Sequence, residues 1–229
     1  MIKGISFDVW GTIFGDSFFS EISKHYSMDN GITQQEVDKK MDEAYKLLRE
    51  NRKQGAIPPG SDPVAYSLKL IESFGFDLEK FKSALAKALL TVEPEPLLMP
   101  GVKDALSKLS GKYKLILLGN VVYWPGAYTR VLMERAGLSN FFSAQLYSDE
   151  IGTSKPYRDA FSLALKALEL DNPSEAVHVG DNLYEDFCGA VSSDFHAVLV
   201  SGKANQTIRV EGNFIINRIE ELPSVISAL

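Results

Sequence analysis

Short apolar runs alternate with longer amphipathic segments along most of this chain. Near-continuous apolar runs lie at 5–7, 114–118 and 176–179, and each is followed by an aspartate or a glycine. Such runs are too short for helices and are typical of parallel strands that are buried on both faces. The segments between them carry apolar residues at spacings of three and four, as helices that cover a sheet do. The pattern therefore predicts an α/β fold.

Strands and helices continue to alternate toward the C-terminus. Further strands are predicted at 144–147, 197–200 and 214–216. Helices are predicted at 102–109, 126–136, 159–170, 185–191 and from about residue 219 onward. Alternation of this kind implies a parallel sheet with right-handed crossovers. We expect a doubly wound, Rossmann-like core.

The stretch from about 16 to 91 differs, because it shows helical periodicity and no convincing strand. Three helix starts are recognisable in it: Thr33 with Glu36 as a capping box, Ser61 or Asp62 with Pro63, and Asp77. The Pro58–Pro59 pair breaks the chain between two of these helices. We therefore expect an α/β core of residues 1–15 and 97–229, with an all-helical cap domain at 16–96 inserted after the first strand.

Composition and charge narrow the class of partner. The 229 residues are 45% hydrophobic and 24% charged, as in an ordinary globular protein. The net charge of −6 and the lack of a long basic run disfavour nucleic acid or an anionic membrane as a partner. With one cysteine, Cys188, no internal disulfide forms. No signal-like start or long apolar span is present, so we expect a cytoplasmic protein with a small-molecule partner; the oligomeric state is unknown.

Polar residues follow several of the predicted strands. Asp8 comes after the first, Asn120 after the second and Asp181 after a later one. The carboxyl ends of parallel strands share one edge of the sheet, and open α/β sheets bind ligands there. Lys155 lies in a glycine-containing loop before a helix, and Asp186 follows Asp181 by five residues. We expect Asp8, Asn120 and Asp181 to share this edge, and Asp186 is placed so that it can point back to the same crevice.

The order of these residues resembles that of the haloacid dehalogenase-like hydrolase superfamily. The resemblance rests on Phe7-Asp8-x-x-Gly11-Thr12, Asn120, Lys155-Pro156 and Gly180-Asp181-x-x-x-x-Asp186. It covers the whole α/β part, and the helical insertion resembles the cap domain of that family. The resemblance implies that the protein is a hydrolase.

The resemblance also implies roles for the matched residues. Asp8 would be the nucleophile and would form a covalent aspartyl intermediate. Lys155 would offset negative charge on the nucleophile and the substrate, and Asn120 with nearby backbone N–H groups would hold the transferred group. The substrate contacts implied in this way are Trp10, Thr12, Gly119, Asn120 and Lys155.

Both the resemblance and the excess of predicted carboxylates over lysine imply that the site binds a metal ion. Mg²⁺ would be held by Asp181 with support from Asp186, together with Asp8 and the backbone carbonyl of Trp10. If the three carboxylates are packed together, at least one stays protonated unless a cation is present, and Lys155 balances only one of them. A hard, oxygen-liganded cation such as Mg²⁺ resolves the excess and also binds a phosphate oxygen.

Two positions depart from the phosphatases of the family. Those enzymes have a second aspartate two residues after the nucleophile, as general acid, where this chain has Trp10. They usually have a serine or threonine where this chain has Gly119. General acid catalysis contributes about 10²–10⁴-fold to a rate. Phosphomonoesters with a poor leaving group are therefore expected to react slowly, and acyl phosphates, aryl phosphates or phosphonates to suffer least.

Three functions fit these residues. The leading prediction is a Mg²⁺-dependent phosphohydrolase that acts on a small phosphorylated metabolite through an aspartyl phosphate on Asp8. A metal-independent 2-haloacid dehalogenase is an alternative, because that branch also lacks the second aspartate and commonly has an aromatic residue at the position of Trp10. The dehalogenases are less acidic around the Gly180-Asp181 loop, which favours the phosphohydrolase. A non-catalytic protein of the same fold that binds a ligand or partner is the third possibility.

Other polar or aromatic residues have structural interpretations. Arg49, Arg52 and Lys53 close a predicted helix and either meet an anionic substrate or, as is more usual, form a solvated helix end. Trp10 is expected to contact the cap rather than to take part in the chemistry. His178 lies inside a predicted strand and is expected to be a core histidine.

Overall fold

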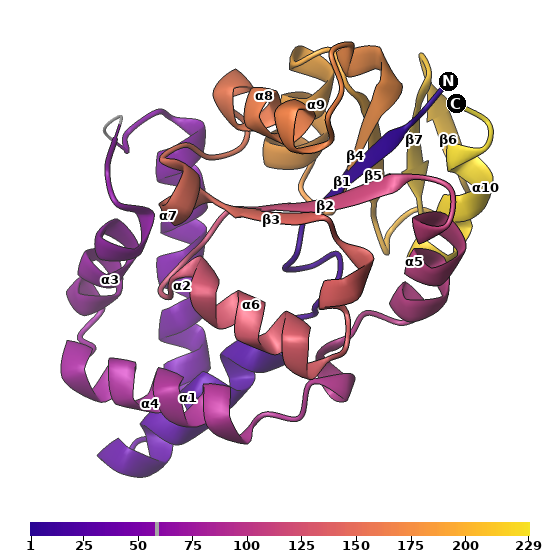
Figure 1. Ribbon diagram of the computed structural model, residues 1–229. Helices are drawn as coiled ribbons and strands as arrows, with labels where there is room; N and C mark the ends of the chain where they lie inside the picture. Colours follow the sequence, from indigo (N-terminus) through magenta and orange to yellow (C-terminus); the bar gives the residue numbers. More distant parts are fainter. Residues whose placement is uncertain (58–59) are drawn as a thin grey trace.

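The computed structural model describes residues 1–57 and 60–229, and the predicted break at Pro58 and Pro59 lies outside them. The described residues form a seven-stranded sheet in the order β3-β2-β1-β4-β5-β7-β6 (Figure 1). The strands are β1 (Gly4–Phe7), β2 (Lys114–Gly119), β3 (Ala144–Tyr147), β4 (Ala176–Gly180), β5 (His196–Val200), β6 (Ile208–Val210) and β7 (Asn213–Ile216). All neighbouring strands run parallel except β6, which pairs antiparallel with β7. The α/β, Rossmann-like prediction is confirmed.

The register of the central strands sets the place of the candidate site. Phe7, the last residue of β1, lies opposite Leu117 of β2 and Val179 of β4. From β1 the chain proceeds to β2 and β3 on one side, and later to β4 and β5 on the other. The order of strands therefore reverses between β1 and β4. In open α/β sheets such a switch point creates a crevice at the carboxyl ends of the strands.

Helices cover both faces of the sheet. Leu115 and Leu117 of β2 belong to one core layer and Ile116 and Leu118 to the other, because successive side chains of a strand point to opposite faces. The first layer packs against α5 (Val102–Ser110), α6 (Gly126–Arg135) and α10 (Leu222–Ile226), and the second against α8 (Arg158–Ala167) and α9 (Gly189–Ser192) (Figure 1). No helix among the described residues is both long and apolar enough to cross a membrane.

Four α-helices follow β1 within the described residues and lie to one side of the sheet (Figure 1). They are α1 (Ser17–Asn30), α2 (Gln34–Lys53), α3 (Pro63–Ser73) and α4 (Leu78–Thr91), here called the four-helix block. The predicted starts are confirmed, because the side chains of Thr33, Asp62 and Asp77 accept hydrogen bonds from backbone N–H groups of α2, α3 and α4. Such caps satisfy donors that the first turn leaves unpaired.

Two differences from the sequence prediction have a physical reason. The edge strand β6 was not predicted, because it has only 3 residues, all of them exposed, and so short a stretch shows no recognisable period. The predicted helix at 185–191 instead begins with a π-helical turn, Leu183–Cys188, which continues into α9. The wider turn leaves the consecutive residues Glu185 and Asp186 both buried. Single π-helical turns inside helices occur frequently at functional sites.

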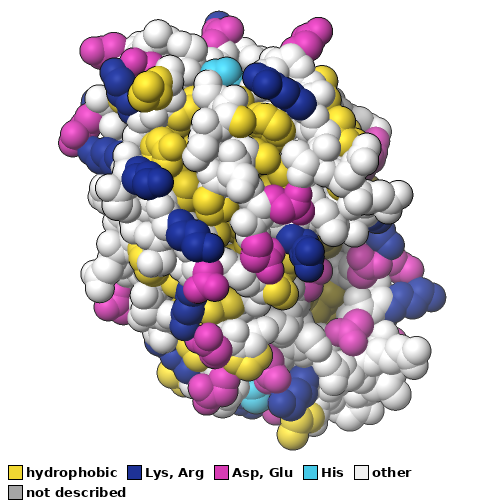
Figure 2. Space-filling model, turned by 90° about the vertical axis from the view of Figure 1, so that its right-hand side faces the viewer, with side chains coloured by type: hydrophobic (Ala, Val, Ile, Leu, Met, Phe, Trp, Pro, Cys, Tyr) yellow, Lys and Arg dark blue, Asp and Glu magenta, His cyan; other side chains and the backbone are white. Residues whose placement is uncertain are grey.

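Charged side chains are mixed on the molecular surface. On the face shown in Figure 2, Lys and Arg side chains alternate with Asp and Glu side chains rather than gathering in one basic patch.

Candidate active site

Lys155 joins two of the predicted acidic residues. It lies in the loop between α7 (Ser148–Ile151) and α8, and its side chain is only 1% exposed. The Lys155 ammonium donates hydrogen bonds of 2.6 Å to Oδ1 of Asp8 and of 2.6 Å to Oδ1 of Asp186. Asp8 follows β1, and Asp186 lies in the π-helical turn after β4. The fold therefore brings together the three residues as the sequence predicted.

Burial and charge shift the pKa values of this cluster in opposite directions. Burial would lower the pKa of Lys155, but Asp186 and Asp8 outweigh it and raise that pKa. Burial would raise the pKa of Asp186, but Lys155 and a hydrogen bond from His178 lower it. The pKa of Asp8 is raised well above its ordinary value by burial and by the other two carboxylates, against the effect of Lys155. The cluster is thus short of positive charge.

A third carboxylate completes an oxygen-rich site. Asp8, Asp181 and Asp186 each offer a carboxylate oxygen, and these oxygens lie within 4.8 Å of one another. Asp181 opens toward solvent, yet desolvation within the crevice and then the charge of Asp186 raise its pKa to about 7. A divalent, oxygen-preferring cation fits this donor set, because it supplies the charge that one lysine does not.

Two glycines allow the carboxylates to approach the backbone. A Cβ on Gly180 would lie 2.2 Å from Cγ of Asp186, and a Cβ on Gly11 would lie 2.6 Å from Cγ of Asp181. Gly11 also has a φ of +90°, which side-chain-bearing residues rarely adopt. Each glycine therefore makes room for one acid of the cluster.

Asn120 positions the loop that carries Lys155. Its Nδ2 donates to the carbonyl of Lys155 and to Oε2 of Glu185, both at 2.9 Å, and its Oδ1 accepts from the N–H of Lys155 at 2.9 Å. The three bonds occupy both amide protons and the oxygen of the side chain. In this arrangement Asn120 acts on Lys155 through the backbone, and a direct contact with a transferred group stays a prediction.

Arg52 connects α2 to the same network. Its Nη2 donates to the carbonyl of Val121 at 2.9 Å, and its Nη1 lies 3.5 Å from Oε1 of Glu185. The side chains of Arg52 and Glu185 are each 10% exposed. The solvated helix end that the sequence favoured therefore holds for exposed Lys53 but not for Arg52. The sequence analysis assigned no role to Glu185. The only feature of the sequence that could have indicated one is its position next to Asp186.

His178 of β4 contacts Asp186 and helps to orient it. Its Nδ1 lies 2.7 Å from Oγ of Ser6, and its Nε2 lies 3.1 Å from Oδ1 of Asp186. Burial and then Lys155 lower the pKa of His178, which favours the neutral ring. In the tautomer that satisfies both contacts, Nε2–H donates to Asp186 and the Ser6 hydroxyl donates to Nδ1. The expected core histidine thus also orients an acid of the site.

Trp10 packs into an aromatic cluster at the boundary with the four-helix block. Its ring stacks on Phe18 of α1 at 5.6 Å and meets the edge of Trp124 at 5.3 Å. This contact agrees with the structural interpretation of Trp10. Thr12 is buried, and no described residue forms a hydrogen bond with its Oγ1.

Gly119 lies against a tyrosine. A Cβ at this position would be 3.3 Å from Cδ1 of Tyr147 and 3.3 Å from Cγ2 of Val9. These contacts are tight, so a serine or threonine at Gly119 would require its neighbours to move. The aromatic ring of Tyr147 therefore explains why glycine fits at this position.

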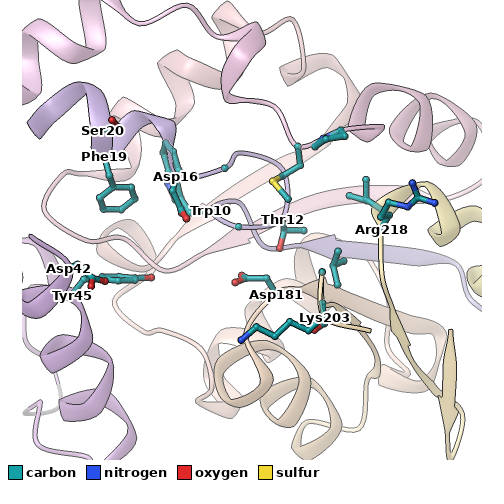
Figure 3. A pocket seen from close by; sticks show the side chains of 18 of the residues that line it. Trp10, Thr12, Asp16, Phe19, Ser20, Asp42, Tyr45, Asp181, Lys203 and Arg218 are labelled. Atoms are coloured by element: carbon teal, nitrogen blue, oxygen red, sulfur yellow. The ribbon is translucent and has the colours of Figure 1, made fainter. Parts of the chain in front are cut away.

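A cavity of about 1180 Å³ opens between the four-helix block and the sheet edge. Trp10, Thr12 and Asp181 line it from the core, and Tyr45 and Arg49 line it from α2. Figure 3 shows Tyr45 and Asp181 on opposite sides of this space, with Lys203 extending toward the region of Asp181. The candidate metal-binding acid therefore faces a space that is large enough for a small metabolite.

The known proteins that this chain resembles are hydrolases. A family model described as haloacid dehalogenase-like hydrolase matches residues 2–192. A glyceraldehyde 3-phosphate phosphatase of Methanothermobacter thermautotrophicus is 25% identical over 99% of this chain and 100% of its own length. The (S)-2-haloacid dehalogenase 2 of a Pseudomonas species is 25% identical over 99% of this chain and 96% of its own length. The magnesium-bound crystal structure of the HAD hydrolase YfnB from Bacillus subtilis has a TM-score of 0.75, with 18% identity and 98% of each chain covered.

Proposed function

Because the chain belongs to the haloacid dehalogenase-like hydrolases, we propose that it is a Mg²⁺-dependent phosphohydrolase of a small phosphorylated metabolite. The observation that carries this proposal is the cluster of Asp8, Asp181 and Asp186, with oxygens within 4.8 Å and Lys155 as the ammonium bonded to two of them. A metal-free reaction does not require so many carboxylates in one crevice. Relatives named glyceraldehyde 3-phosphate phosphatase support a phosphorylated substrate.

In the proposed reaction, each residue of the cluster has its own chemical role. Asp8 attacks phosphorus, the bond to the leaving group breaks, and water then hydrolyses the aspartyl phosphate. Lys155 holds Asp8 in place and offsets charge on the transferred group. When bound, Mg²⁺ would be held by Asp8, Asp181, Asp186 and the Trp10 carbonyl, and would withdraw charge from a phosphate oxygen.

The four-helix block is the cap domain in this proposal. Residues 16–96 would form the cap, and residues 1–15 and 97–229 the catalytic core. The cavity supports this division, because α2 contributes Tyr45 and Arg49 to its wall while the core contributes Asp181 and Lys203. Arg49 and Lys203 also provide positive charge near the candidate position of an anionic substrate. Thr12 and Gly119 would contact the transferred group through their backbones.

A 2-haloacid dehalogenase is the second candidate. The aromatic residue at Trp10 and the relative named (S)-2-haloacid dehalogenase 2 favour it. Its mechanism uses a carboxylate nucleophile at Asp8 as well, so mutation of Asp8 does not separate the two functions. Metal dependence does, because a displacement that uses no metal does not need Asp181 as a third carboxylate beside the two that Lys155 binds.

The test measures three reactions of the purified protein. Hydrolysis of p-nitrophenyl phosphate and of acetyl phosphate, and halide release from 2-chloropropionate, are followed with Mg²⁺ and with EDTA. We expect Mg²⁺-dependent phosphate release that falls about 10³-fold or more in Asp8→Asn. Asp171→Asn is the matched control and is expected to retain full activity, because Asp171 is exposed and precedes the start of β4, whereas Asp181 follows the end of that strand. Phosphate release that survives both EDTA and Asp8→Asn, or halide release without metal, contradicts the proposal.

A further inference from the structure

The position at which related phosphatases carry their proton donor is occupied by a group that has no acidic proton. Trp10 stands two residues after Asp8, and its indole ring packs against Phe18 and Trp124. An indole N–H donates hydrogen bonds but does not give up its proton at physiological pH. If an alkoxide is to leave, its proton has to come from another side chain of the cavity.

Tyr45 is the phenol that faces this space. It lies on α2, is half-buried, and lines the same cavity as Trp10 and Asp181. In Figure 3 the Tyr45 hydroxyl and the Asp181 carboxylate point toward each other across the cavity. No hydrogen bond joins the Tyr45 hydroxyl to another described residue. Its O–H is therefore available to a substrate that lies between the four-helix block and the acidic cluster.

Neighbouring side chains hold the ring of Tyr45 in this orientation. The ring lies 5.9 Å from that of Phe19 at an interplanar angle of 48°, and the guanidinium carbon of Arg49 lies 5.9 Å from its centroid. Aromatic packing restricts the ring, and the cation favours negative charge that develops on the phenol oxygen.

Burial and the neighbouring charges keep the proton of Tyr45 in place before reaction. Burial and then the charge of Glu185 raise the pKa of Tyr45 above its ordinary value, Arg49 and Arg52 act to lower it, and Asp181 also acts to raise it. The phenol is thus protonated at neutral pH, in the form that donates.

We propose that Tyr45 of α2 is a catalytic residue that donates its proton to the leaving-group oxygen in place of the acid absent at Trp10. This inference rests on the proposed phosphohydrolase function. As the bond from an Asp8 oxygen to phosphorus forms, the bond from phosphorus to the leaving oxygen breaks, and that oxygen takes the proton of Tyr45. In the second step the tyrosinate takes a proton from the attacking water, which releases hydrogen phosphate and restores both the phenol and the Asp8 carboxylate.

The leaving group provides the test, because only a poor leaving group needs the proton. Tyr45→Phe is compared with the wild type on glycerol phosphate, whose alkoxide is a poor leaving group, and on p-nitrophenyl phosphate, whose phenolate leaves unaided. We expect kcat for glycerol phosphate to fall about 10²-fold and kcat for p-nitrophenyl phosphate to change less than about threefold. Across a series of aryl phosphates, the rate of the variant should depend more steeply on the leaving-group pKa.

The matched control is Tyr66→Phe. Tyr66 is a half-buried tyrosine of α3 in the same four-helix block, and its hydroxyl accepts a hydrogen bond from Asn51 at 3.1 Å. The kcat of this variant for each of the two substrates should equal that of the wild type. Thermal unfolding should show that Tyr45→Phe and Tyr66→Phe are both folded.

Equal loss on both substrates in Tyr45→Phe would mean that Tyr45 only supports the structure or binds substrate, and no loss on either would mean that it has no role. Both outcomes overturn the assignment while leaving the phosphohydrolase function intact. A wild-type protein that releases phosphate from neither substrate instead contradicts the function itself, and the assignment falls with it.

Discussion

Lys155 is the residue on which the buried charges of the site depend. Its ammonium bonds to Asp8 and Asp186 at 2.6 Å, while Asp181 completes the acidic cluster. The position of Asp186 is in turn fixed by His178 and by the close approach of Gly180. Small changes at these positions therefore change the arrangement of the acids directly.

Gly180→Ala tests this dependence at the scale of one residue. The added Cβ would lie 2.2 Å from Cγ of Asp186, so either the strand end or the carboxylate has to move. We expect the free energy of unfolding to fall by about 1–3 kcal/mol. We also expect kcat/KM to fall about 10²-fold, because a displacement of about 1 Å in a catalytic group has that effect. Urea unfolding and steady-state kinetics measure the two quantities.

Gly111→Ala is the control for that experiment. Gly111 ends α5 in a helical backbone conformation, and no atom of the described residues lies within 4 Å of a Cβ built on it. This change should alter the free energy of unfolding by no more than about 1 kcal/mol and leave kcat/KM unchanged. If Gly180→Ala behaves like Gly111→Ala, the close contact with Asp186 does not constrain the site.

At the scale of elements, α2 connects the four-helix block to the acidic crevice. Tyr45, Arg49 and Arg52 are spaced by four and three residues, so they lie on one face of the helix. Tyr45 and Arg49 line the cavity, and Arg52 reaches Glu185 and the Val121 carbonyl. One helix therefore supplies both the wall of the cavity and a contact that holds this wall against the core.

Arg52→Ala tests that contact. The substitution leaves Glu185 without its cation and the Val121 carbonyl without its donor, so we expect the free energy of unfolding to fall by about 1–3 kcal/mol. The only two tryptophans, Trp10 and Trp124, both pack against α1, so their fluorescence reports the seating of the four-helix block. Acrylamide should quench this fluorescence more strongly in the variant.

Lys53→Ala provides the comparison from the adjacent, exposed position of α2. Its stability should stay within about 0.5 kcal/mol of the wild type, and its quenching should be unchanged. Arg52→Lys should restore part of the contact, since lysine keeps the charge but not the paired donors of the guanidinium. Equal quenching in Arg52→Ala and Lys53→Ala would show that Arg52 does not hold the block.

At the scale of the whole molecule, the charge deficit of the crevice links metal binding, pH and stability. An ion that binds only the folded protein stabilises it by about 2.7 kcal/mol when its free concentration is one hundred times its Kd. For a chain of this size, each kcal/mol of added stability raises the Tm by about 2–4 °C. Mg²⁺ should therefore raise the Tm of the wild type by several degrees. Asp181→Asn should reduce this shift, because it removes one of the three carboxylates.

The shift in Tm should grow as pH rises through about 7. Asp181 has a pKa raised to about 7, and Asp8 has a pKa raised well above its ordinary value, so at pH 5.5 protons compete with the cation for these oxygens. Without metal, the stability of the folded protein should change with pH in the opposite direction. The folded Asp181 retains a proton that the unfolded chain releases near pH 3.8, so stability should fall as pH rises from about 4 to 7.

Scanning calorimetry at pH 5.5 and 7.5, with Mg²⁺ and with EDTA, measures both effects. A Mg²⁺ shift that is equal at the two pH values, or that Asp181→Asn leaves unchanged, would contradict binding at these carboxylates.

The sequence by itself determined the α/β fold, the starts of three helices in the four-helix block, and the meeting of Asp8, Lys155 and Asp186. The fold and the helix starts follow from local caps and from the period of apolar residues, and the shared edge of parallel strands places Asp8 in the crevice. The place of Lys155 beside the acids was implied by the resemblance to the haloacid dehalogenase-like hydrolases. Only the tertiary structure decided that Asn120 bonds to Lys155 and Glu185, that Arg52 reaches Glu185, and that Tyr45 faces Asp181. Arg52 and Glu185 are 133 residues apart, and nothing in their local sequence records their contact. That contact depends on how the four-helix block packs on the sheet edge and on the π-helical turn that buries Glu185.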